Sequence, residues 1–151
     1  MSDNNDWPFF EKQPEDRHER ASGRVNATPL FKLLGLTLDE SDTDFARVSV
    51  EARPELANPN GITHGGIHAT LIDTAIGQAL TTTIKPGWSM VTIEMDVKYF
   101  KPTSKDRLIA EGRIVRKGKR IAHGEVDLRD EKGELLGKGW CVYAIVPMPA
   151  R

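Results

Sequence analysis

Residues 58–84 carry the groups in this chain whose types and spacing could do chemistry. Between Gly65 and residue 84 the only carboxylate is Asp73, and it stands in a largely apolar run. Burying a carboxylate is costly without partners, so such an acid is typical of a hydrogen-bond network or a chemical role. Just upstream, Gly65 and Gly66 would let a ligand come close to backbone N–H groups, because glycine has no side chain.

A single helix is predicted to run from Gly65 to about residue 84, with Asp73 at its middle. Its apolar residues recur at helical spacing on more than one face, which is typical of a helix enclosed by the rest of the fold. An alternative is a shorter helix over residues 74–83, with Asp73 as its N-cap. The apolar pattern already present at residues 70–72 favours the longer helix. The apolar positions are Ile67, Leu71, Ile72, Ala75, Ile76, Ala79 and Leu80.

The spacing within this helix points to a site shared between two chains. The first N–H groups of a helix are unpaired and attract an anion or a developing oxyanion. Gly66 and Asp73 are seven residues apart, which is about 10 Å of helix rise, and the side chain recovers only a few ångströms. One chain therefore cannot easily bring the two together. We hypothesise that a symmetric dimer pairs Gly65 of one chain with Asp73 of the other.

The motif in this stretch resembles the signature of the hot-dog-fold acyl-CoA thioesterases, in particular the phenylacetyl-CoA (PaaI-like) branch. The resemblance covers about residues 30–147, and it combines several fixed positions at fixed spacing with the apolar helix behind them. The motif reads Asn58-x-x-Gly61-x-x-His64-Gly65-Gly66, then six residues, then Asp73.

The resemblance implies a role for each position of the site. Gly65 would polarise the thioester carbonyl through its N–H, and Asp73 would act as nucleophile or general base. Thr92 would help to place water. Asn58 and His64 would order the loop or contact the carbonyl. In this family two protomers share each site, which agrees with the spacing, and the neighbouring Gly66 is expected to contact substrate.

The composition is that of an ordinary globular protein. The chain has 151 residues, 38% hydrophobic and 28% charged, with a net charge of -1, so nothing draws it generally to nucleic acid or membranes. No apolar run approaches a membrane span and the start lacks a signal peptide, so a cytoplasmic location is expected. The single cysteine, Cys141, excludes an internal disulfide and is expected in the core. His64 and His68 lie four apart, but no second ligand pair accompanies them, so no metal site is predicted.

The order of predicted elements indicates an α+β fold with an antiparallel sheet wrapped around one long central helix. An N-terminal arm, residues 1–28, contains the apolar island Trp7–Phe10 and a mixed-charge run over residues 15–20, and one domain follows over residues 29–151. Hairpin turns are expected at Gly118 and Gly133. A short helix is predicted over 29–35, and strands over 36–40, 45–52, 91–100, 107–116, 120–129 and 135–146.

Strand 91–100 shows a regular alternation of apolar and polar residues. Val91, Ile93 and Met95 are predicted on one face together with Val97 and Tyr99, against the helix. Thr92 is then expected on the opposite face, away from the helix.

Basic residues gather around the turn at Gly118. Residues 101–120 hold eight Lys and Arg against two acids. The pattern fits either a solvated hairpin edge or a surface that binds the phosphates of coenzyme A. On the second interpretation Arg116, Lys117 and Lys119 would bind substrate. The other two residues counted in this cluster are Arg113 and Arg120.

We therefore predict an acyl-CoA thioesterase without a cofactor of its own, coenzyme A being part of the substrate. We expect it to assemble as a homodimer or homotetramer, with no nucleic-acid or membrane partner. The alternatives are a non-catalytic acyl-CoA-binding module, which would bind without releasing thiol, and a hot-dog dehydratase, which would need a different Asp/His arrangement.

Overall fold

The computed structural model describes residues 28–148. Residues 1–27 and 149–151, which include the Trp7–Phe10 island and the charged run at 15–20, lie outside the described part, so the predicted arm and domain boundary stay predictions. The helical elements are α2 (Pro29–Leu34), the short 3-10 helix η2 (Pro54–Leu56) and α3 (Gly65–Thr81). The strands are β1 (Thr37–Asp42), β2 (Phe45–Glu51), β3 (Trp88–Tyr99), β4 (Arg107–Lys117), β5 (Ile121–Asp130) and β6 (Leu135–Pro147).

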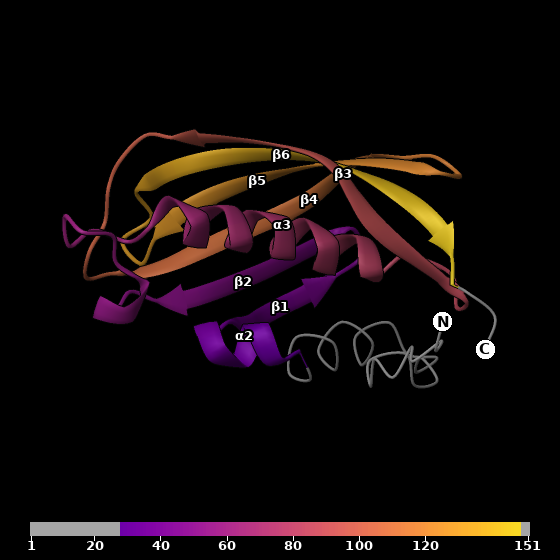
Figure 1. The fold of residues 1–151 in the computed structure, drawn as a ribbon. Coiled ribbons are helices and arrows are strands. Elements are labelled where there is room, and N and C mark those ends of the chain that lie inside the picture. Colours follow the sequence, from indigo (N-terminus) through magenta and orange to yellow (C-terminus); the bar gives the residue numbers. More distant parts are fainter. Residues whose placement is uncertain (1–27, 149–151) are drawn as a thin grey trace.

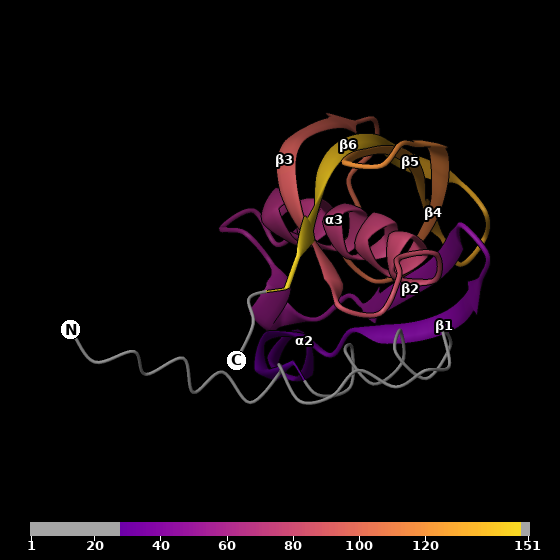
Figure 2. The ribbon, with the colours of Figure 1, turned by 90° about the vertical axis from the view of Figure 1, so that its right-hand side faces the viewer.

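The strands form one six-stranded antiparallel sheet in the order β1-β2-β4-β5-β6-β3. The sheet curves around α3, which lies along its concave side (Figures 1 and 2). The predicted α+β arrangement, a sheet wrapped around one central helix, is therefore confirmed. β3 follows α3 in sequence but pairs with the last strand, β6, and so becomes an edge of the sheet.

α3 is the centre of the core. It has 17 residues, and Leu71, Ile72 and Ile76 are completely buried. Burial of such a side chain contributes about 1.5–3 kcal/mol relative to leaving it exposed. The helix approaches the sheet closely because glycines face it from three strands, β4, β5 and β6. A Cβ on Gly112 would lie 2.6 Å from the Ala75 carbonyl carbon, and a Cβ on Gly139 would lie 2.3 Å from a methyl of Ile72.

The ends of the smaller elements follow local backbone chemistry. α2 begins with Pro29, whose missing N–H costs nothing at the first turn of a helix, and ends at Gly35, which is left-handed with φ 74°. The turn between β1 and β2 is shorter than predicted. β1 extends to Asp42, and only Thr43 and Asp44 remain as the turn.

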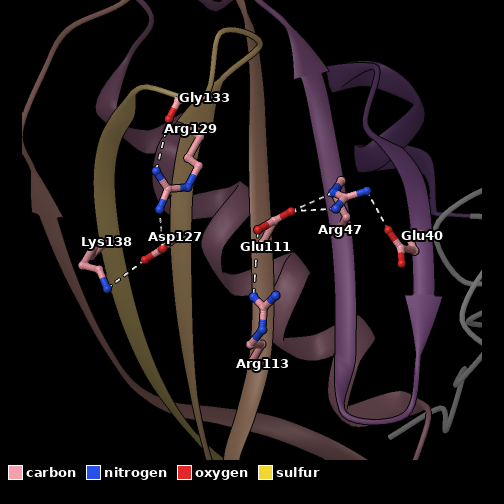
Figure 3. Close-up of polar contacts among 8 residues, drawn as sticks. All are labelled: Glu40, Arg47, Glu111, Arg113, Asp127, Arg129, Gly133 and Lys138. Atoms are coloured by element: carbon pink, nitrogen blue, oxygen red, sulfur yellow. Dashed lines mark hydrogen bonds and ion pairs between the residues drawn. The ribbon is translucent and has the colours of Figure 1, made fainter.

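The convex face of the sheet carries ion pairs between neighbouring strands (Figure 3). Arg47 on β2 bridges Glu40 on β1 and Glu111 on β4, at 2.6 and 2.7 Å. Arg113 also faces Glu111, at 3.9 Å, and its guanidinium lies 4.7 Å from the centroid of the Phe45 ring. Arg113, predicted to belong to the basic cluster at the Gly118 turn, is therefore also part of this charged face.

A β-bulge in β3 overturns the predicted alternation of that strand. Thr92 pairs with Tyr143 of β6 and Glu94 pairs with the preceding residue, Val142, so that Ile93 is an extra residue. Because side chains alternate with a period of two, one extra residue exchanges the two faces. Thr92 therefore faces α3, and the prediction that it faces away is wrong. Val91, 56% exposed, lies on the outer face instead.

Candidate active site

The first turn of α3 presents one backbone N–H that has no acceptor among the described residues. His64 is the N-cap, and its Nδ1 accepts a hydrogen bond of 2.8 Å from the N–H of Gly66. This bond requires that Nδ1 is unprotonated, so neutral His64 carries its proton on Nε2. Gly66, predicted to contact substrate, has its N–H occupied by this cap. The N–H of Gly65 remains available for a ligand.

Asn58 orders the loop that leads into α3. Its side-chain oxygen accepts from the N–H of Asn60 at 2.9 Å and of Ile62 at 3.4 Å, and its carbonyl accepts from Gly61 at 2.9 Å. Gly61 has φ 75°, a left-handed conformation that favours glycine. The spacing from Asn58 to Gly61 is therefore the spacing of one closed turn.

Tyr99, near the end of β3, contacts the glycine turn at the start of α3. Its hydroxyl donates to the carbonyl of Gly65 at 3.0 Å, and a Cβ on Gly65 would lie 3.2 Å from its ring. The peptide unit between Gly65 and Gly66 is thus held at both ends, by Tyr99 at its oxygen and by His64 at its N–H. This clamp fixes the direction of the first turn of the helix.

Asp73 lies in the middle of α3 and is not an N-cap, since the helix begins at Gly65. Its Oδ1 accepts two hydrogen bonds, from the hydroxyl of Thr92 at 2.9 Å and from the hydroxyl of Tyr143 at 2.5 Å. Its Oδ2 has no hydrogen-bond partner among the described residues. The carboxylate therefore has one oxygen held by donors and one oxygen open.

The side chains around Asp73 are protonated at neutral pH. Tyr143 is 4% exposed, and its pKa is raised by burial and by the nearby charge of Asp73. The same two causes raise the pKa of Cys141 to about 12, so this buried thiol is not a nucleophile.

The structure brings together Asp73 and Thr92, but it does not bring Asp73 to Gly65 of the same chain. Eight residues of one continuous helix separate them, about 12 Å of rise. The Asp73 side chain, moreover, is directed at β3 and β6. Tyr143 was not among the site residues predicted from the sequence. The available signal was its alternation with Cys141 on the last strand, which places both on the helix-facing side.

His68, one turn into α3, is buried and 4% exposed. Its ring stacks on Tyr99 with 5.7 Å between centroids, and neither ring nitrogen has a hydrogen-bond partner among the described residues. Burial lowers the pKa of His68 below its ordinary value of 6.5, because the charged form loses its hydration.

We expect His68 to make the fold less stable in mild acid. As the pH is lowered below 6.5, the unfolded chain binds a proton at this residue before the folded chain does. The free energy of unfolding therefore decreases as the pH is lowered. The slope for one group reaches about 1.4 kcal/mol per pH unit. When it is measured by urea unfolding, the free energy of unfolding should decrease less from pH 8 to pH 5 for His68→Leu than for the unmodified chain. Equal losses in the two proteins would contradict this prediction.

A cavity of about 410 Å³ lies beyond the C-terminal end of α3. Lys85, Lys117 and Lys119 line it, and Nζ of Lys117 donates to the carbonyl of Thr83 at 2.8 Å. Arg116, predicted to act with these lysines, is exposed and does not line the cavity. The remaining lining is Thr83, Ile84, Trp88, Gly118 and Ile145, so the cavity is lined by apolar side chains together with three lysines.

Two features are absent from residues 28–148. No group of three or more His, Cys, Asp or Glu side chains is placed to hold a metal ion in this part of the chain. None of its helices has the length and apolar character needed to cross a membrane.

Comparison with known proteins identifies the family. A family model for the thioesterase superfamily matches residues 60–136, a range that begins just before the glycine turn and includes Asp73 and Thr92. A putative esterase from Halobacterium salinarum is 34% identical over 104 residues, which are 66% of this chain and 68% of that protein. The medium/long-chain acyl-CoA thioesterase YigI of Escherichia coli K12 is 26% identical over 132 residues, which are 78% of this chain and 85% of YigI.

Solved structures of other proteins have the same fold as this chain. A thioesterase from Haemophilus influenzae superimposes with a TM-score of 0.82 at 16% identity, covering 93% of this chain and 97% of that one. The Escherichia coli PaaI protein from the phenylacetic acid degradation operon has a TM-score of 0.79 at 18% identity, covering 89% and 94%. The predicted hot-dog fold is confirmed. The chain belongs to the thioesterase superfamily, and it is a thioester hydrolase.

Proposed function

We propose that this protein hydrolyses thioesters of coenzyme A with an aryl or medium-chain acyl group, as a member of the PaaI-like branch. The observation that carries the proposal is the pair of Asp73 and Thr92, hydrogen-bonded halfway along a helix whose first turn presents the N–H of Gly65. YigI, similar over most of its length, is a medium/long-chain acyl-CoA thioesterase.

In the proposed reaction the carbonyl oxygen of the thioester accepts a hydrogen bond from Gly65 N–H. This bond strengthens as the oxygen becomes anionic, because the donor is fixed in advance. Asp73 then acts in one of two ways: it attacks the acyl carbon, forming a mixed anhydride that water hydrolyses after the thiolate has left, or it removes a proton from water that attacks the acyl carbon directly. In both cases Thr92 helps to place the water. The C–S bond breaks and the thiolate takes a proton. The products are a carboxylic acid and free coenzyme A, and no further cofactor takes part.

The proposed site lies between two copies of the chain, so that Gly65 of one faces Asp73 of the other. β3 supports this arrangement because it is an edge strand of 12 residues, with unpaired backbone groups along one side. Its apolar side chains are also uncovered, with Ile93 57% exposed. Thr92 lies on this edge, so a second copy paired there would lie next to the carboxylate.

We assign the nucleotide end of coenzyme A to the cavity at the end of α3. Lys117 and Lys119 offer ammonium groups to its phosphates, and Lys85 lines the same cavity. The ring of Trp88 offers a surface on which a base can stack. Arg116 lies outside the cavity, so its positive charge would contribute only by attracting the anionic substrate at long range.

Removal of these ammonium groups should weaken binding without slowing chemistry. We expect Lys117→Ala/Lys119→Ala to raise KM for an acyl-CoA about tenfold, the loss of roughly 1.4 kcal/mol of binding, with kcat within about twofold. Thiol release from the same acyl group on N-acetylcysteamine, which lacks phosphates, should not change. Lys101→Ala is the matched control, because Lys101 is paired with Glu134 at 2.6 Å and does not line the cavity. An equal rise in KM for both thioesters would show that the two lysines do not bind the phosphates of coenzyme A.

The test of the proposed function is release of free thiol from a panel of aryl, medium-chain and long-chain acyl-CoA esters. Steady turnover of at least one ester supports the proposal, and the ratios of kcat/KM identify the acyl group. Tight binding of a CoA ester without thiol release would instead make the protein an acyl-CoA-binding module. Addition of water to an enoyl-CoA would indicate a dehydratase.

A further inference from the structure

Tyr143 contacts the candidate catalytic acid more closely than any other described side chain. Its hydroxyl is 2.5 Å from Oδ1 of Asp73 and 2.7 Å from the backbone oxygen of the same residue. The hydroxyl also lies against the next turn of the helix, where a Cβ on Gly77 would be 3.4 Å from it, an ordinary contact. The ring belongs to the hydrophobic core, so the phenol approaches Asp73 from a rigid part of the fold.

Both donors to Asp73 bind the same oxygen. Thr92 and Tyr143 are neighbours across the β3–β6 ladder, so their hydroxyls meet at Oδ1. The terminal torsion of an aspartate is broad and nearly two-fold. Two donors on one oxygen remove this freedom and fix the direction of the other oxygen. The acid is therefore oriented before any substrate binds.

We propose that Tyr143 is a positioning residue that acts with Thr92 to hold Oδ1 of Asp73, so that Oδ2 is the atom that attacks the acyl carbon or removes a proton from water. The inference rests on the proposed function of Asp73 and adds to it the choice of oxygen. A raised pKa keeps Tyr143 protonated at neutral pH, so its hydroxyl can donate to the carboxylate. Fixing a reactive group in this way lowers the barrier, because its orientation is set in advance.

Tyr143→Phe removes the hydroxyl and keeps the buried ring. We expect kcat with an acyl-CoA to fall about tenfold or more, with KM within about twofold. Tyr99→Phe is the matched control. It removes the only other tyrosine hydroxyl of the chain, which bonds Gly65 rather than Asp73, so any effect that it has on turnover should persist in the Asp73→Asn background.

A double-mutant cycle separates positioning from a general effect on folding. If Tyr143 acts through Asp73, Tyr143→Phe should cause no further loss of turnover in the Asp73→Asn background. The same relative loss in both backgrounds would overturn the inference. A chain with Tyr99→Phe and 3-fluorotyrosine at 143 gives a second measurement that does not depend on losing the phenol. Because this residue keeps a hydroxyl donor, kcat should stay within about twofold of the Tyr99→Phe chain. A loss as large as that of Tyr143→Phe would contradict positioning.

The outcomes also separate this inference from the proposed function. If the unmodified chain releases no thiol from any acyl-CoA, both fail. If release depends on Asp73 but not on Tyr143, only the positioning role fails.

Discussion

Asp73→Asn is expected to lower kcat with an acyl-CoA at least ~100-fold while the protein stays folded. Asparagine keeps an oxygen that can accept from Thr92 and Tyr143, so the hydrogen bonds that hold the side chain are retained. The second oxygen is replaced by an amide NH₂, which is neither a nucleophile nor a base. The substitution thus removes the reactive atom and little else.

The measurement is steady-state thiol release, with circular dichroism and Tm to establish that the fold is intact. Asp96→Asn is a suitable control, because Asp96 is an exposed carboxylate on the same strand as Thr92 and is paired with Lys98 at 2.7 Å. The control should keep turnover within about twofold, as for most exposed substitutions. Unchanged turnover in Asp73→Asn would remove Asp73 from the mechanism.

Gly65→Pro is expected to lower kcat about 100-fold or more, because it deletes the backbone N–H that polarises the carbonyl. Proline is tolerated at the first position of a helix, where the N–H has no helical partner. Gly65 occupies this position, and His64 before it has φ -60° and ψ 136°, which suits a residue preceding proline. The helix should therefore form as before.

Gly65→Ala is the control for the added side chain. Both variants place a Cβ 3.2 Å from the ring of Tyr99, which is 55% exposed and free to move slightly. Only the proline variant lacks the N–H. If alanine costs as much turnover as proline, the loss comes from the Cβ and the amide has no special role.

Mixing the two inactive variants tests whether the site is shared. In a dimer of one Asp73→Asn chain and one Gly65→Pro chain, one site combines both defects and the other has neither. Each such dimer should recover about half the activity of the unmodified dimer. Differently tagged chains, purified as the mixed species, give the measurement. No recovery in the mixed dimer would place Gly65 and Asp73 of each site in one chain.

Local patterns in the sequence determined most of the architecture. The uninterrupted apolar repeat after Gly66 fixes a buried helix, and a helix of that length places Asp73 at its middle. The same spacing implies that Asp73 cannot reach Gly65 of its own chain. Glycines at 118 and 133 mark the two hairpins. These features depend on neighbours within a few residues of one another, so composition and periodicity are sufficient to find them.

The orientation of Thr92 was decided only in the folded sheet. Alternation along the strand predicts that Thr92 faces away from the helix, and the bulge at Ile93 reverses this. Whether a strand accommodates an extra residue depends on the register of its partner. Here that partner is β6, about fifty residues further along the chain.

The contact between Tyr143 and Asp73 was also decided only in the folded structure. The sequence shows a tyrosine in an alternating strand, but its contact with Asp73 requires that β6 pair with β3 and cross the middle of α3. Such a contact joins residues 70 positions apart, and its geometry is set by glycines that let helix and sheet approach. The sequence therefore determined which acid is present and on which helix it lies, whereas the fold decided which donors hold it and which oxygen stays open.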